Sequence, residues 1–244
     1  MKKTLALLFL PYLVYSQSSL IFSEYGEGTS YNKWIEIYNP TLQSVYLDEY
    51  RYNFCWNGCD SLEWEFSIPF DSGYILLPGE TYLLAHYNSD SLLLNTANQT
   101  TNILSNGNDV AALLHIPLNT IIDIIGVFDS SSNIIGWDIG TTINATKDHT
   151  LKRKTNVCSG NFGDWSVSNG STSPSEWIVG IEDDFTNLNT HYSNCISTSI
   201  NNTTSSEKKL LEVRDLLGRK NTSKQNILLY IYSDGTVKKI IQVE

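Results

Sequence analysis

Apolar and polar residues alternate within short segments along most of the chain. In Leu62–Phe66 every second residue is apolar, and Trp34–Tyr38 shows a similar alternation around Glu36. A period of two residues is typical of a β-strand that has one face toward a core. Pro40 follows the second segment and ends it, because proline cannot donate to a strand ladder.

Short strands separated by turn-forming residues account for nearly all of the central chain. A short helix is expected only around Ser91–Asn95, within an Asn/Ser/Thr-rich stretch. The pattern predicts an all-β fold, an antiparallel β-sandwich. The expected strands cover residues 20–24, 34–38, 45–47, 50–54, 62–66, 74–77, 81–86, 110–115, 120–128, 134–137, 150–154 and 177–180.

The C-terminal segment 208–244 has a pattern of its own. Apolar runs flank Asp234-Gly235, a dipeptide that favours the positive φ angles of a two-residue hairpin turn. Together with a Leu-Leu-Gly-Arg turn and a Tyr-x-Tyr strand before the hairpin, the segment resembles the C-terminal sorting domain of the Bacteroidetes type IX secretion system. The resemblance implies a small β sorting domain that the secretion machinery recognises; the alternative is a hairpin that completes the main domain. The residues that carry the resemblance are Leu217, Gly218, Arg219, Tyr230, Tyr232, Asp234 and Gly235.

The N-terminal residues 1–16 have the features of a secretory signal peptide. Lys2 and Lys3 precede an apolar stretch from Thr4 to Tyr15, and Ser16 stands at a suitable cleavage position. No other segment approaches 18 consecutive apolar residues, so we expect no transmembrane helix in the mature chain. These features predict a protein that is secreted or displayed on the outer face of the outer membrane.

Charge is distributed unevenly between the segments. Residues 17–206 hold 21 acidic and 6 basic residues, a net of −15, whereas residues 1–16 contribute +2 and residues 207–244 contribute +3, giving the total of −10. An acidic body argues against a nucleic-acid partner, because affinity for nucleic acid depends on neutralising phosphates. Lys152-Arg153-Lys154 is a basic cluster, for which we expect a solvated strand edge. The polar residues 197–207 read as a linker between a domain at 17–196 and the segment 208–244.

Four cysteines in an exported chain suggest two disulfides. Three pairings are possible, and we favour Cys55–Cys59 with Cys158–Cys195. The first closes a small loop eased by Gly58, and the second ties a strand to the end of the domain. Further thiol or imidazole ligands at zinc-binding spacing are not evident, so we expect no metal and no cofactor.

A second resemblance covers most of residues 19–195. Blocks such as Leu20–Glu24, Asn32–Pro40 and Leu77–Glu80, followed by Asn106–Leu113 and Leu151–Lys154, are similar to the lamin-tail domain in its exported bacterial form. The resemblance implies an immunoglobulin-like sandwich. The Cys55–Cys59 region and residues 88–105 do not fit the minimal pattern.

Candidate catalytic groups are few. The chain lacks a Gly-x-Ser-x-Gly elbow, a His-Glu-x-x-His motif and a P-loop. Glu24 and Glu36 lie on strands expected to be neighbours and could form an acid/base pair. A structural role is the simpler interpretation, with hydrogen bonds from the backbone or from Lys33. Glu182–Asp184 could offer oxygens to Ca²⁺, although its spacing fits a solvated acidic loop better.

Trp56 lies inside the small disulfide loop and could be exposed beside Tyr52, where an aromatic ring can stack on a sugar or anchor a protein. Packing over the sheet end is the alternative. Without catalytic motifs, we expect a non-catalytic binding or adhesion module at the cell surface, with an unknown surface, matrix or protein ligand. The alternative is an accessory component of an extracellular hydrolase or nuclease system.

Overall fold

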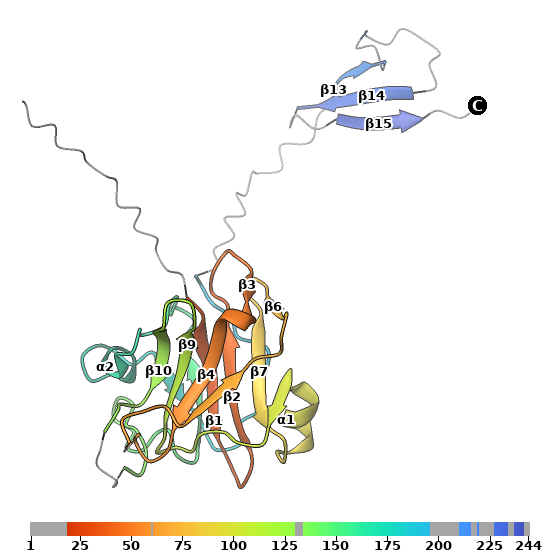
Figure 1. Cartoon of the computed structure of the whole chain (residues 1–244). Coiled ribbons are helices and arrows are strands. Elements are labelled where there is room, and N and C mark those ends of the chain that lie inside the picture. The colour runs from red at the N-terminus through yellow and green to blue at the C-terminus, as the bar shows by residue number, and fades with distance from the viewer. Residues whose placement is uncertain are drawn as a thin grey trace, which may run out of the picture. The chain divides into compact units, whose positions relative to one another are not determined.

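Figure 1 shows the computed structural model of the chain. It describes residues 19–59, 61–129, 134–195, 210–215, 219, 227–233 and 237–241. The expected signal peptide 1–16 and linker 197–207 lie outside these residues. The chain divides into two compact units between Ile196 and Ser197, where the polar stretch begins.

Two antiparallel sheets and one short strand pair build the first unit (Figure 1). The larger sheet has the order β12-β11-β1-β2-β7-β8, and only its β7–β8 pair is parallel. The second sheet has the order β10-β9-β4-β5, and β3 pairs with β6. The strands of the larger sheet are β1 (Ile21–Glu27), β2 (Lys33–Tyr38), β7 (Thr81–His86), β8 (Gln99–Thr101), β11 (His149–Arg153) and β12 (Trp177–Val179). The remaining strands are β3 (Val45–Tyr46), β4 (Tyr50–Cys55), β5 (Phe66–Pro69), β6 (Ile75–Leu76), β9 (Val110–His115) and β10 (Thr120–Ile125). Short helices are η1 (Leu47–Glu49), α1 (Ser91–Thr96) and α2 (Trp165–Asn169).

The core lies between the two large sheets, and it confirms the predicted immunoglobulin-like sandwich. Ile35 and Ile37 of β2 face it from one sheet, and Phe54 and Leu113 face it from the other. All four side chains are at most 1% exposed. The alternation along β2 therefore reports its two faces correctly, because the preceding residue Trp34 packs in a separate cluster on the outer face.

A segment that we call the strap, residues 181–195, packs on that outer face. Phe185 packs against Trp34 with ring centroids 5.1 Å apart, and Leu188 is buried beside it. At the start of the strap, Asp183 accepts hydrogen bonds from the backbone N–H of Thr29 and from the Asn32 side chain. The strap end is joined to Cys158 through Cys195. Anchored at both ends, the strap buries the second face of a sheet that would otherwise be solvated.

Two expected strands are wrong in detail. Residues 62–65 form a turn and β5 begins only at Phe66, because Cys59 and Leu62 adopt positive φ angles of 65° and 58° as the disulfide loop reverses the chain. Residues 134–137 form no named strand. Instead, the Trp137 backbone N–H donates to Thr146 Oγ1 and its indole donates to the Asp109 carbonyl.

The basic cluster is not a solvated edge, since β11 lies between β12 and β1. Arg153 is buried and donates to Asp123 at 2.8 Å and to Glu176 at 2.7 Å, with its guanidinium 4.5 Å from the Trp177 ring centroid. Period-two alternation explains the error, because Lys152 is partly exposed and the side chain of the next residue, Arg153, therefore points toward the core.

The second unit contains a separate three-stranded antiparallel sheet in the order β13 (Leu210–Arg214), β14 (Ile227–Tyr232) and β15 (Val237–Ile241). Tyr230 pairs with Val213, and Tyr232 pairs with Leu210. Within the described residues, none of these strands joins a sheet of the first unit. The C-terminal hairpin therefore does not supply strands to the β-sandwich.

Candidate functional site

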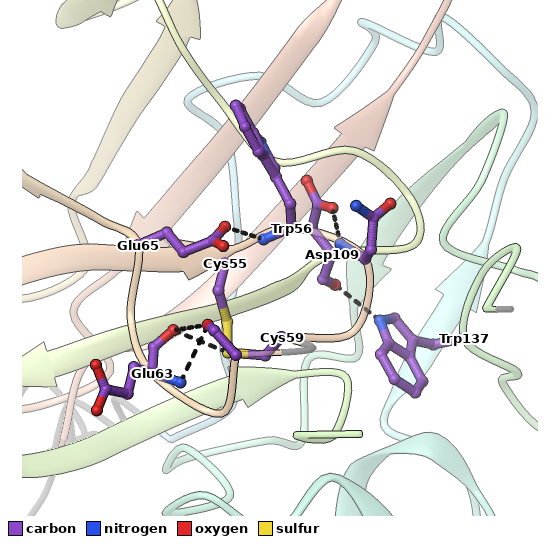
Figure 2. Close-up of a disulfide and its surroundings, with 9 residues drawn as sticks. Cys55, Trp56, Cys59, Glu63, Glu65, Asp109 and Trp137 are labelled. Atoms are coloured by element: carbon purple, nitrogen blue, oxygen red, sulfur yellow. Dashed lines mark hydrogen bonds between the residues drawn. A yellow bond between two sulfur atoms is a disulfide. The ribbon is translucent and has the colours of Figure 1, made fainter. Parts of the chain in front are cut away.

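The loop that follows β4 is closed by the Cys55–Cys59 disulfide, and we call residues 55–59 the Trp56 loop (Figure 2). All four backbone N–H groups from Trp56 to Cys59 donate hydrogen bonds. The acceptors are, in order, Glu65 Oε2 at 2.8 Å, Asp109 Oδ1 at 2.9 Å, the Asn108 carbonyl at 2.7 Å and the Trp56 carbonyl at 2.8 Å. A loop with its backbone donors satisfied and its ends covalently joined has little freedom left.

The Trp56 side chain points away from the disulfide (Figure 2) and is 43% exposed. Its ring packs on Phe66 with centroids 4.8 Å apart, and Phe66 stacks on buried Phe54 at 4.6 Å. Aromatic contacts through Phe66 and Phe54 thus connect the indole to the core. Sequence reasoning missed this support, because Phe66 lies on the partner strand and only the observed register brings it under Trp56.

Tyr52 does not belong to the exposed site. It is fully buried in the core, its hydroxyl lies 2.6 Å from Ser105 Oγ, and burial raises its pKa well above the usual range. Tyr52 and Phe54 both face the core, as alternation along β4 requires. The strand ends at Cys55, so the turn that follows directs Trp56 outward instead of inward.

Glu24 and Glu36 do lie together: they are direct cross-strand partners on β1 and β2, only 2% and 1% exposed. Burial raises the pKa of Glu24 to about 8, with a further contribution from the Glu36 charge. Burial also raises the pKa of Glu36 to about 7, against hydrogen bonds from Ser23 and Asn189. Near neutral pH, Glu24 is therefore mainly in the protonated, uncharged form, and Glu36 is divided between its protonated and ionised forms.

The hydrogen bonds of this pair come from its surroundings and not from Lys33. Trp34 Nε1 donates to Glu24 at 3.3 Å, and Ser23 Oγ donates to Glu36 at 2.7 Å. From the strap, the Asn189 backbone N–H donates to Glu36 at 2.5 Å. Lys33 instead forms an ion pair with Glu27 at 2.9 Å. The strap therefore covers the two carboxylates, and their arrangement supports the structural interpretation over an acid/base pair that meets a substrate.

Histidines of the first unit are held in local contacts. His86 Nε2 lies 3.1 Å from the Asn102 carbonyl, and its Nδ1 accepts from the Asn88 backbone N–H at 3.2 Å. Burial lowers the pKa of His86, and burial lowers that of His191, which packs on Tyr38, to about 4. Among the described residues, His191 Nε2 is buried without a hydrogen-bond partner.

The acidic run of the strap is partly solvated, with Glu182 exposed, and it is also bound to the rest of the first unit. Asp184 pairs with Lys152 at 2.6 Å, and this contact contributes to its lowered pKa. Glu182 accepts from the Thr29 hydroxyl. Within the described ranges no group of three or more His, Cys, Asp or Glu residues is arranged to hold a metal ion. These carboxylates act as anchors of the strap.

Of the residues expected to carry the sorting signal, Tyr230 and Tyr232 lie on β14. Arg219 donates from its backbone N–H and its side chain to Asp215. The remaining four, Leu217, Gly218, Asp234 and Gly235, lie outside the described residues.

The disulfides join the favoured pairs, Cys55 with Cys59 and Cys158 with Cys195, and among the described residues no cysteine is free. Two disulfides are typical of a protein that folds outside the cytoplasm. The helices described are all too short or too polar to cross a membrane.

Comparison with known proteins identifies the sandwich. The family model of the lamin tail domain matches residues 14–129. A solved structure of a DUF4876 family protein from Bacteroides thetaiotaomicron matches with 13% sequence identity and a TM-score of 0.40. The match covers 66% of this chain and 68% of that protein's chain. No curated protein matches the sequence. The part of the β-sandwich up to residue 129 is thus similar to the lamin tail domain.

Proposed function

We propose that this chain is an exported, non-catalytic binding module that type IX secretion delivers to the cell surface or the medium. The observation that carries the binding role is the Trp56 loop, a rigid support that presents one large aromatic ring to solvent. Loops on rigid sandwiches are common binding surfaces. The buried carboxylate pair offers no comparable opening for catalysis.

Delivery is inferred from the two ends of the chain. Residues 1–16 have the pattern of a signal peptide, and residues 208–244 resemble a sorting domain. The separate sheet β13-β14-β15 supports this proposal, because an export address must be readable without unfolding the cargo. The secretion machinery is the proposed partner, and its proposed contacts are Leu217, Gly218, Arg219, Tyr230, Tyr232, Asp234 and Gly235.

The delivery role is tested by expressing the chain with and without residues 208–244 in a bacterium that has type IX secretion. The full chain is expected at the cell surface or in the medium, and the truncated chain in the periplasm. Since the sandwich has its own core, the truncated chain is expected to stay folded, which protease resistance of the periplasmic fraction checks. Equal surface delivery of both forms would contradict the sorting assignment.

An accessory role in an extracellular hydrolase or nuclease system is the weaker alternative. The net charge of −15 over residues 17–206 opposes independent binding of nucleic acid. Such a role would therefore depend on a second protein, and the Trp56 loop would be the surface that binds it.

A further inference from the structure

We propose that the Trp56 loop binds neutral carbohydrate, with a sugar ring stacked on the indole of Trp56. This inference rests on the proposed binding function and names its ligand class. Three features of the described residues support it: the rigidity of the loop, the polar groups around the ring, and the sign of the charge nearby.

Rigidity matters because a weak ligand cannot supply the free energy needed to order a loop. The disulfide and the four donated backbone N–H groups fix Trp56 before any ligand arrives. Phe66 beneath the indole further limits its side-chain rotamers. A ring held in this way binds without the ordering cost that flexible loops incur on association.

The groups around Trp56 complement the hydroxyls of a sugar. The indole Nε1–H is a donor, Glu65 Oε1 is an acceptor, and the Asn57 side-chain N–H₂ is a donor; among the described residues none of the three has a hydrogen-bond partner. Asn57 and Glu65 are both exposed; Glu65 Oε2 accepts from the Trp56 backbone N–H, and Asn57 Oδ1 accepts from the Asn108 side chain. The face of a pyranose ring carries C–H groups that pack on an aromatic face, while its rim carries hydroxyls that both donate and accept. An exposed ring beside a free donor and a free carboxylate oxygen fits this ligand.

Charge selects a neutral sugar over an anionic one. The sequence 55–66 contains no lysine or arginine, and Glu63 and Glu65 are exposed. Carboxylated or sulfated polymers would meet repulsion from these groups and from the acidic body.

A protein partner fits the surface less well. Stable protein interfaces bury roughly 800 Å² on each side around an apolar centre. Within the described part of 55–66, only Trp56 and Leu62 are exposed apolar side chains. One supported ring amid polar groups suits a sugar better than a protein surface.

The test uses the full chain with its disulfides formed, in affinity electrophoresis through gels that contain one polysaccharide each. Xyloglucan, mannan and laminarin are the neutral probes, and polygalacturonate is the anionic probe. Migration is expected to be retarded by at least one neutral polymer and not by polygalacturonate. Trp56→Ala is expected to weaken binding about tenfold or more. Tyr46→Ala, which removes another exposed aromatic ring, is the matched control and is expected to bind as the unchanged chain does.

Circular dichroism shows that each variant is folded, so a loss of binding reports on the ring alone. Retardation by none of the neutral polymers, or equal retardation of Trp56→Ala and the unchanged chain, overturns the proposal. If the chain instead binds whole bacterial cells or extracellular protein, and Trp56→Ala abolishes that binding, the carbohydrate assignment fails while the binding module stands. If Trp56→Ala changes no binding of any kind, the proposed function of this loop fails as well.

Discussion

The buried pair Glu24 and Glu36 is expected to make the stability of the β-sandwich fall as the pH rises through neutrality. Both pKa values are raised above the usual 4.5, to about 8 and about 7, chiefly by burial. The folded state therefore keeps two protons that the unfolded chain has already released. The stability that these two groups contribute is fully present below about pH 4.5. It is lost as the pH rises through the two folded pKa values.

The magnitude follows from proton linkage. Each proton bound only in the folded state lowers the free energy of unfolding by about 1.4 kcal/mol per pH unit. The two groups together give a slope of roughly 2.5 kcal/mol per unit near pH 6, which falls to roughly 2 near pH 7 and toward zero above pH 8. Asp109, with a pKa raised to about 6, acts mainly below this window. His86 and His191, with lowered pKa values, have the opposite effect, mainly below their usual value of 6.5.

Glu24→Gln isolates the effect. The amide keeps an oxygen that can accept from Trp34 Nε1, and its N–H₂ can donate to Glu36, so the cross-strand contact persists without the titrating group. Between pH 6.5 and 8 the slope of stability against pH is expected to fall by about two-thirds. The variant is expected to be more stable than the unchanged chain at pH 8.5, and within about 1 kcal/mol of it at pH 5.

Urea unfolding followed by tryptophan fluorescence measures this directly at half-unit steps of pH. All six tryptophans precede residue 197, so the signal reports on the first unit alone. Glu63→Gln, at an exposed carboxylate, is the control and is expected to leave the slope unchanged. Identical slopes for Glu24→Gln and the unchanged chain between pH 6.5 and 8 would refute the reasoning, since the carboxyl would then already be ionised in the fold.

Two further substitutions test other parts of the fold. Replacing both cysteines of the Cys158–Cys195 bridge by serine is expected to lower stability by about 4 kcal/mol on the loop-entropy estimate, against about 2 kcal/mol for Cys55–Cys59; equal losses in urea unfolding would contradict the role of loop length. Arg153→Met is expected to cost about 3–5 kcal/mol, because it leaves Asp123 buried without its partner. Adding Asp123→Leu should recover part of that loss in a double-mutant cycle, and strict additivity of the two costs would count against the pair.

Some strands of the sandwich could be predicted from alternation, because a strand with one buried face shows its period in the sequence. Residues 34–38 and 50–54 follow this rule, and their core-facing residues are the ones that the period selects. The rule fails at 62–66, where the alternation is real but Leu62 adopts a positive φ that no strand accepts. The alternation of apolar and polar residues does not report the backbone conformation of each residue.

The candidate site was only half predictable for a related reason. Trp56 could be singled out because the small disulfide loop is visible in the sequence, whereas Tyr52 was wrongly grouped with it. Separating the two requires knowing that β4 ends at Cys55. Arg153 and Asp123 are 30 residues apart in the sequence and lie on different sheets. Their pairing depends on how the sheets pack, and no local signal in the sequence marks it.

The position of Cys195, one residue before the unit boundary, has a mechanical consequence. When tension is applied to the chain from residue 196 onward, it passes through the sulfur–sulfur bond into Cys158 and bypasses the 36 residues between them. Helix α2, strand β12 and the strap are then shielded from pulling. If the protein is tethered by its C-terminal side under flow, these elements would stay folded until the disulfide bond itself is reduced.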